Sequence, residues 1–167
     1  MKSITVRTKI GKYFTVGEFV PKGLLATKGD KIVIETYKKV SRELVHYLDL
    51  LRKLVGHPVI ITSGYRPRAY NKKVGGARGS QHIYGRAADI VIPGMRYIEA
   101  LEAVLKLPFR GIGIYNNGTI HVDVRPLRKD EPRALWCGIK TSSGYEYISF
   151  AEGFARLGSL IFKVMKI

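Results

Sequence analysis

A histidine and an aspartate seven positions apart, His82 and Asp89, are the residues that most directly indicate metal chemistry in this sequence. They lie in the pattern S-x-H-x-x-G-x-A-x-D at 80–89. Zinc needs its ligand atoms about 2.0–2.2 Å away, whereas seven residues of α-helix rise by about 10.5 Å. The segment is therefore not expected to be helical. We expect a loop that carries His82, a turn at Gly85 and a strand that carries Asp89.

A second histidine lies in a predicted β-hairpin. Two runs of alternating apolar residues, 111–115 and 119–125, flank Asn116-Asn117-Gly118, which is a strong turn signal. A two-residue loop would set the polar residues of the second run opposite isoleucines, so we predict a three-residue loop that ends at Gly118. That register pairs Ile120 with Ile114, Val122 with Ile112, His121 with Gly113, and Asp123 with Gly111.

This register gives the hairpin two different faces. Apolar side chains share one face, and His121, Asp123 and Arg125 alternate on the other, above two glycines, where we expect open space for a metal ion. His82, Asp89 and His121 together offer two nitrogens and one carboxylate. Three protein ligands with an open fourth position are typical of catalytic zinc. Iron is the alternative, because His82, His121 and Asp123 also form a two-histidine, one-carboxylate set.

The elements before these ligands can be predicted from apolar periodicity. Short extended pieces cover residues 4–20, although Thr15-Val16-Gly17-Glu18 has the form of a helix capping box, and Pro21-Lys22-Gly23 is a turn. One apolar stripe predicts a single helix that begins at Gly29-Asp30 and ends near Val55. The apolar run at 59–63 predicts a buried strand.

The residues that lead to the first ligand form a basic segment. Residues 65–81 contain five lysines and arginines and no acidic residue. The segment is either a solvated loop or an anion-binding rim beside His82. After Asp89, apolar residues at helical spacing over 94–107 predict a helix that Pro108 ends.

The C-terminal residues predict a further hairpin and a terminal helix. Trp136, Tyr145 and Tyr147 flank a turn at 142–144, and apolar residues recur at helical steps over 150–167. We expect this helix to dock on the domain. Its basic residues also support the alternative of a weak contact with a membrane surface.

Length and charge limit the class of protein. The 167 residues fit a single domain, which we expect to be a monomer. Lysine and arginine number 29 against 13 acidic residues, so the formal net charge is +16. Such a charge attracts nucleic acid, anionic lipid or the anionic polymers of a bacterial wall. The one cysteine, Cys137, excludes an internal disulfide. The N-terminus shows no signal peptide and no transmembrane span, so we expect synthesis in the cytoplasm.

Three segments together resemble the zinc D-Ala-D-Ala carboxypeptidases and endopeptidases of bacteria and their phages. They are I-T-S-G-Y-R-P at 61–67, G-G-A-R-G-S-Q-H-I-Y-G-R-A-A-D-I at 75–90, and G-I-G-I-Y with H-V-D-V-R at 111–125. The same group contains lysostaphin-type peptidases and the hedgehog signalling domain. The resemblance covers a core of residues 12–136 and leaves 137–167 as an extension. It implies an α+β fold, in which a small antiparallel sheet carries the ligands and helices pack against it.

The resemblance also implies roles for individual residues. His82, Asp89 and His121 would be zinc ligands, with peptides of bacterial peptidoglycan as the substrate. Arg66 matches an arginine that steadies the substrate carbonyl as it becomes an oxyanion. Ser80 matches a serine that contacts substrate near the metal. The high charge and the missing signal peptide favour a phage lysis enzyme, which reaches the cell wall through a membrane lesion or as part of a virion.

The sequence departs from the family at the general base. Many relatives place an acidic residue three positions before the last metal-ligating histidine, or a histidine two positions before it. Gly118 and Thr119 occupy these positions, and neither can accept a proton from water. Asp123 is the nearest replacement, either as the base or as a partner that orients His121.

Two other classes of function compete with the peptidase. A zinc-binding module that binds the cell wall without activity, similar to the hedgehog branch, is supported by the missing base. A nucleic-acid-binding protein is supported only by the charge, since the sequence has no recognition motif. We therefore expect a zinc metallopeptidase that acts on peptidoglycan, with anionic wall polymers as further partners and no specific nucleic acid.

Overall fold

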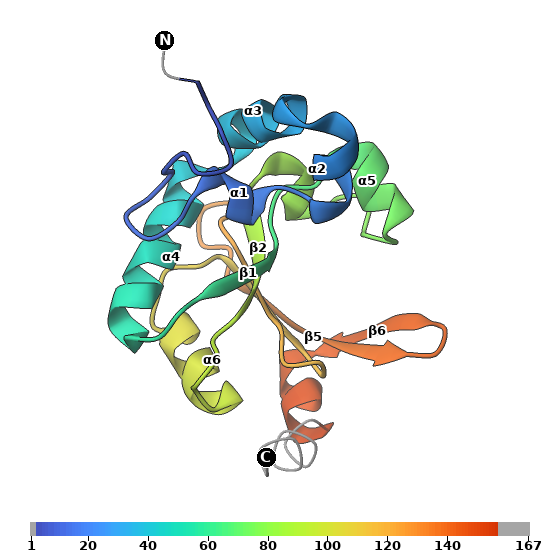
Figure 1. Cartoon of the computed structure of the whole chain (residues 1–167). Coiled ribbons are helices and arrows are strands. Elements are labelled where there is room, and N and C mark those ends of the chain that lie inside the picture. The colour runs from blue at the N-terminus through green and yellow to red at the C-terminus, as the bar shows by residue number, and fades with distance from the viewer. Residues whose placement is uncertain (1–2, 157–167) are drawn as a thin grey trace.

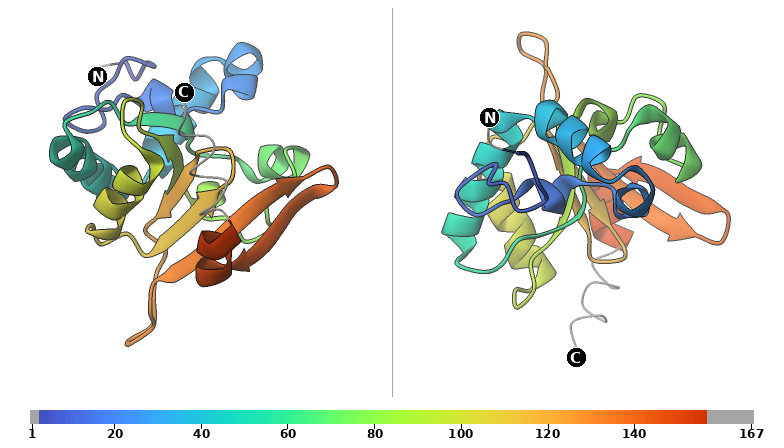
Figure 2. Two further views of the ribbon diagram at one scale, coloured as in Figure 1. Left: turned by 90° about the horizontal axis from the view of Figure 1, so that it is seen from below. Right: turned by 45° about the horizontal axis from the view of Figure 1, so that its top comes forward.

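The computed structural model describes residues 3–156, in which helices pack against a six-stranded sheet (Figures 1 and 2). The strands are β1 (Ile60–Ser63), β2 (Ala87–Val91), β3 (Gly111–Tyr115), β4 (Ile120–Asp123), β5 (Ala134–Thr141) and β6 (Gly144–Ser149). Their order in the sheet is β1-β2-β4-β3-β5-β6. Neighbouring strands are antiparallel except β3 and β5, which are parallel. The expected α+β class is confirmed, although the sheet is mixed and not purely antiparallel.

Most of the helices come before residues 82–89 in the chain, and others come after them. They are α1 (Val16–Phe19), α2 (Lys22–Lys28), α3 (Asp30–Lys39), α4 (Arg42–Val55), α5 (Arg68–Lys73), the 3-10 helix η1 (Gln81–Tyr84) and α6 (Tyr97–Leu105). Helix α2 replaces the turn predicted after Pro21, and α5 lies inside the predicted basic loop. Residues 150–156 are also helical, and the rest of the predicted C-terminal helix lies outside the described residues. No helix among residues 3–156 is long and apolar enough to cross a bilayer.

The prediction of one helix from 29 to 55 is wrong, because the chain breaks between α3 and α4. Val40 is extended, and the Ser41 hydroxyl caps α4 by accepting a hydrogen bond from the Leu44 amide at 3.4 Å. The Ser41 amide donates to the Gly85 carbonyl at 2.9 Å. Apolar periodicity continues across the break, so it does not reveal the cap. The break brings the start of α4 against the turn between η1 and β2.

The predicted register of the β3–β4 hairpin is confirmed. Ile120 pairs with Ile114 and His121 with Gly113, and the turn contains Gly118 at φ +82°. All the apolar side chains of the hairpin are consequently on one face of the sheet. They are buried in a core that includes apolar residues of α4 and α6, among them Leu44, Leu48, Leu51, Leu101 and Val104. The opposite face carries the polar residues.

Gly85 occupies a position that only glycine fits. Its φ is +68°, and a Cβ built there would lie 2.2 Å from the Lys39 carbonyl oxygen at the end of α3. This close approach lets the chain turn sharply from η1, which carries His82, into β2, which carries Asp89. The glycine therefore sets the distance between the first two candidate ligands.

Gly85→Ala should destabilise the protein by about 2–5 kcal/mol, because left-handed strain and overlap with the Lys39 carbonyl both oppose the new methyl group. Gly118→Ala is the matched control, since Gly118 also has positive φ but nothing lies within 4 Å of its Cβ position. It should cost only about 1–2 kcal/mol. Urea unfolding of both variants measures the difference, and equal losses would contradict the close approach.

Candidate metal centre

Three side chains from three different elements converge on one point of the polar sheet face. His82 comes from η1, Asp89 from β2 and His121 from β4. His82 Nε2 lies 3.2 Å from Asp89 Oδ1 and 3.2 Å from His121 Nδ1, and the latter two atoms are 2.8 Å apart. Ligands at about 2.05 Å from a tetrahedral zinc ion are about 3.3 Å apart. The three atoms, which we call the ligand triangle, therefore fit a single ion.

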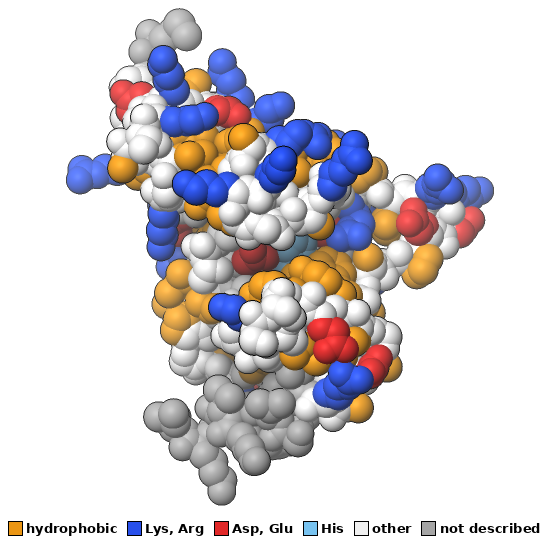
Figure 3. Space-filling view, turned by 90° about the vertical axis from the view of Figure 1, so that its right-hand side faces the viewer, with side chains coloured by type: hydrophobic (Ala, Val, Ile, Leu, Met, Phe, Trp, Pro, Cys, Tyr) orange, Lys and Arg blue, Asp and Glu red, His pale blue; other side chains and the backbone are white. Residues whose placement is uncertain are grey.

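The sheet register explains why two of these groups meet. Asp89 and His121 are direct cross-strand partners of β2 and β4, so their side chains project from the same face. His82 reaches them through the turn at Gly85. In the space-filling view, histidine and acidic side chains lie at the bottom of a hollow (Figure 3). Asp89 keeps 19% of its side chain exposed, so one member of the ligand triangle is accessible from the surface.

The remaining nitrogen of each histidine already has a hydrogen-bond partner. His82 Nδ1 lies 2.7 Å from the Gly64 carbonyl oxygen, to which it donates. His121 Nε2 lies 3.1 Å from Asp123 Oδ2. These contacts leave His82 Nε2 and His121 Nδ1 with lone pairs toward the triangle. Partners of this kind fix the tautomer and orientation of metal-ligating histidines.

Asp123 is fully buried behind His121. Its Oδ1 accepts hydrogen bonds from the Arg125 amide at 2.9 Å and from Arg125 Nε at 2.9 Å. Burial raises the pKa of Asp123, but hydrogen bonds from Arg125 and His121 lower it by more, so the pKa stays well below its usual range. Asp123 is therefore an ionised carboxylate whose oxygens are occupied by neighbouring donors.

Asp89 is likewise held in its charged form. Burial raises its pKa, yet the charges and hydrogen bonds of His82 and His121 outweigh that effect, and the pKa falls far below the usual value. Arg66 Nη2 lies 3.4 Å from Asp89 Oδ2, which places this arginine at the edge of the triangle. Ser80 directly precedes η1 and is half-buried, two positions before His82.

A family model for Peptidase M15 matches residues 12–123. The chain belongs to the peptidase M15 family. The predicted resemblance is thus confirmed, and membership identifies a metallopeptidase related to the D-Ala-D-Ala carboxypeptidases. A search of curated proteins gives no match to the chain. The family match ends at Asp123, so β5 and β6 lie outside the matched part of this M15 peptidase.

Trp136 of β5 is a site residue that the sequence reasoning missed. Open space was predicted above Gly113, but a Cβ at Gly113 would lie 2.5 Å from the Trp136 indole. The indole fills that space and packs on the His121 ring, with centroids 5.1 Å apart. The prediction of open space is wrong because β5 pairs in parallel with β3. The available signal was that Trp136 is the only tryptophan of the chain.

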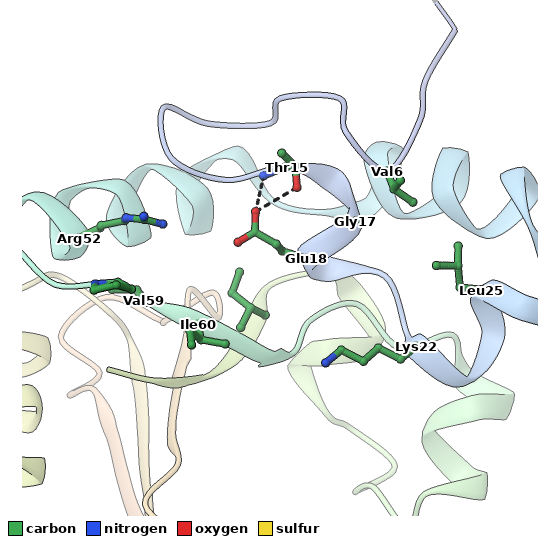
Figure 4. A pocket seen from close by; sticks show the side chains of 11 residues that line it. Val6, Thr15, Gly17, Glu18, Lys22, Leu25, Arg52, Val59 and Ile60 are labelled. Carbon is green, nitrogen blue, oxygen red and sulfur yellow. Dashed lines mark hydrogen bonds between the residues drawn. The ribbon is translucent and has the colours of Figure 1, made fainter. Parts of the chain in front are cut away.

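A groove also lies beside β1 at the edge of the sheet, apart from the ligand triangle (Figure 4). Ile60, Lys22 and Arg52 are among its lining residues, and Glu18 turns back to accept the Thr15 amide at 2.7 Å. None of the triangle residues lines this groove. The groove is therefore separate from the candidate metal centre.

His121→Ala should abolish stoichiometric binding of zinc, because two ligands cannot hold the ion in a closed geometry. His46→Ala is the matched control, since His46 is exposed on α4 and belongs to no cluster with metal-ligand spacing among residues 3–156. Zinc content after dialysis, measured by elemental analysis, checks the prediction. Full retention of zinc by His121→Ala would exclude the triangle as the metal centre.

Asp123→Asn should weaken zinc binding about 10–100-fold, because a neutral amide holds and polarises His121 less well than a carboxylate. The same substitution at the exposed Asp130 should leave the affinity unchanged. Competition with a chromophoric chelator measures both dissociation constants. Identical affinities of the two variants would show that Asp123 does not support His121.

Proposed function

We propose that this M15 peptidase hydrolyses amide bonds in the peptide part of bacterial peptidoglycan, with zinc held by His82, Asp89 and His121. The convergence of their three ligand atoms within 3.2 Å carries the proposal. The donor set supports it as well, since two imidazoles and one carboxylate with a free fourth position are typical of catalytic zinc. The alternative ligand set of His82, His121 and Asp123 is not formed, because Asp123 contacts His121 Nε2 and does not face the triangle.

The residues around the triangle support metal-assisted amide hydrolysis. A bound zinc ion polarises the scissile carbonyl and lowers the pKa of water. Water adds to the carbonyl carbon, the C–N bond breaks, and the leaving amine takes up the proton that the water gives up. Arg66 is assigned to the negative charge that develops on the carbonyl oxygen, a contribution of about 3–4 kcal/mol in comparable sites. Ser80 is assigned to contact with the substrate beside His82.

Asp123 had two candidate roles, general base or orienting partner of His121. Its burial and its hydrogen bonds to Arg125 and His121 favour the second role. A base must reach the water that it deprotonates. Asp123 contacts His121 Nε2, whereas His121 Nδ1 belongs to the triangle, so the imidazole ring lies between Asp123 and the triangle. We therefore assign Asp123 to the position and basicity of His121.

The basic segment supports a polyanionic partner. Lys72, Lys73 and Arg78 are exposed on α5 and the loop that follows it. Lysine and arginine side chains gather on the side of the molecule above the hollow (Figure 3). This field would attract the carboxylates of wall peptides and the anionic polymers of the wall, with a strength that falls with salt. It fits an enzyme that acts on the cell wall, in host lysis or from a virion.

The second candidate function is a zinc module that binds the wall without cutting it. Its support is the lack of an acidic residue at Gly118 and Thr119, together with the occupied carboxylate of Asp123. This candidate predicts zinc and wall binding with no release of peptide fragments.

Digestion of purified peptidoglycan separates the two candidates. The zinc-loaded protein should release fragments with new amine ends, whose masses identify a D-Ala-D-Ala end, a D-Ala cross-link or an L-Ala-D-Glu bond as the one cut. A chelator and His121→Ala should abolish release, because both remove the ion that the chemistry requires. His46→Ala serves as the control and should cut normally. Stoichiometric zinc without any fragments would contradict the peptidase and favour the binding module.

A further inference from the structure

A row of aromatic side chains runs across the sheet from the ligand triangle toward β6. It consists of Trp136, Tyr115, Tyr145 and Tyr147, which we call the aromatic strip. Trp136 packs on His121, and its Nε1 donates to the Tyr115 hydroxyl at 3.4 Å. The Tyr115 and Tyr145 rings meet edge to face at 5.5 Å, and Tyr145 stacks with Tyr147 at 6.2 Å. The chemistry proposed for the triangle does not use this row beyond Trp136.

Strand register places the whole strip on the metal face of the sheet. In β3 and β5, Trp136 pairs with Gly113 and Tyr115 with Gly138. In β5 and β6, Gly138 pairs with Tyr147, and Lys140 pairs with Tyr145. Paired residues project to the same side, so all four rings share the face of His121.

Two glycines leave room for the Trp136 and Tyr115 rings to pack over the neighbouring strand. A Cβ at Gly113 would lie 2.5 Å from the Trp136 indole, and one at Gly138 would lie 2.4 Å from the Tyr115 ring. Each ring thus occupies the space that a side chain on the neighbouring strand would need. The rings therefore form a continuous aromatic surface that begins in contact with His121.

We propose that the aromatic strip is a saccharide subsite, which holds the glycan strand of peptidoglycan while the attached peptide reaches the ligand triangle. This inference rests on the proposed function, because it assigns the polymer that carries the peptide. It lies in strands that the family match does not reach. It gives β5 and β6 a role in substrate selection.

The chemistry of the strip matches a sugar ring. Tyr145 is 44% exposed and Tyr147 is 60% exposed, which is unusual for large aromatic side chains that serve only packing. A pyranose has apolar C–H faces and a rim of hydroxyl groups. The negative face of an aromatic ring attracts the C–H groups, and tyrosine hydroxyls can bond to the rim.

The dimensions and continuity of the strip also fit a polymer. Three strand spacings separate β4 from β6, a span of about 14 Å. This length accommodates a short oligosaccharide. Because the strip begins in contact with His121, a saccharide bound on it would lie on the same sheet face as the ligand triangle, and its attached peptide could extend toward the triangle.

Trp136 provides a direct probe, because its indole belongs to the strip and is the only one in the chain. Titration of the full chain with the β-1,4-linked tetramer of N-acetylglucosamine should give a saturable change in tryptophan emission. Tyr147→Ala should weaken this binding about tenfold, the loss typical of one stacking ring. Tyr147→Phe keeps the ring and should retain most of the affinity.

Tyr84→Ala is the matched control, because Tyr84 is 45% exposed but lies on η1, which contacts β2, and β2 flanks β4 on the side away from β3, β5 and β6. It should bind the saccharide as the unmodified protein does. No emission change, or an equal affinity of Tyr147→Ala and Tyr84→Ala, would overturn the subsite. The tetramer contains no peptide. If the protein digests peptidoglycan but does not bind the tetramer, only the subsite is rejected. Saccharide binding without digestion rejects the hydrolase alone.

Discussion

The cross-strand pair of Asp89 and His121 is the contact on which the rest of the site depends. Both residues face the same side because β2 and β4 are in one register, and a slip of one residue would turn either of them into the core. The apolar residues that alternate with them hold this register, since they are buried beneath α4 and α6. The core thus fixes the geometry of the candidate metal centre, although it contributes no atom to it. His82 is brought to this pair by the tight turn at Gly85.

Glycines shape the polar face as much as charged residues do. Gly111 leaves room for the Asp123 carboxylate, and Gly113 leaves room for the Trp136 indole. Each larger group supports His121 from a different side, one by a hydrogen bond and the other by ring packing. The orientation of one histidine is therefore set by residues from β4 and β5, at positions where β3 has no side chains.

Local patterns in the sequence predicted much of this arrangement. The turn signal before Thr119 and the alternation around it fixed the hairpin register, and the spacing of His82 and Asp89 excluded a long helix between them. The break at Ser41 could not be predicted in the same way, because the apolar stripe continues through it. Trp136 was missed because a parallel partner strand is distant in the sequence and leaves no local signal. The burial of Asp123 depends on Arg125 folding back on it, which alternation alone does not show.

The ligand triangle joins three different elements: two of its ligands, at positions 82 and 89, are seven residues apart, and the third is at position 121. An ion bound there would act as a cross-link between η1 and the middle of the sheet, and so stabilise the folded state as well as the reaction. The chain has one cysteine and therefore no internal disulfide to do this. Coordinate bonds of this kind do not depend on the redox state of the surroundings when the ligands are histidine and aspartate. Such a cross-link would therefore persist in reducing and in oxidising surroundings alike.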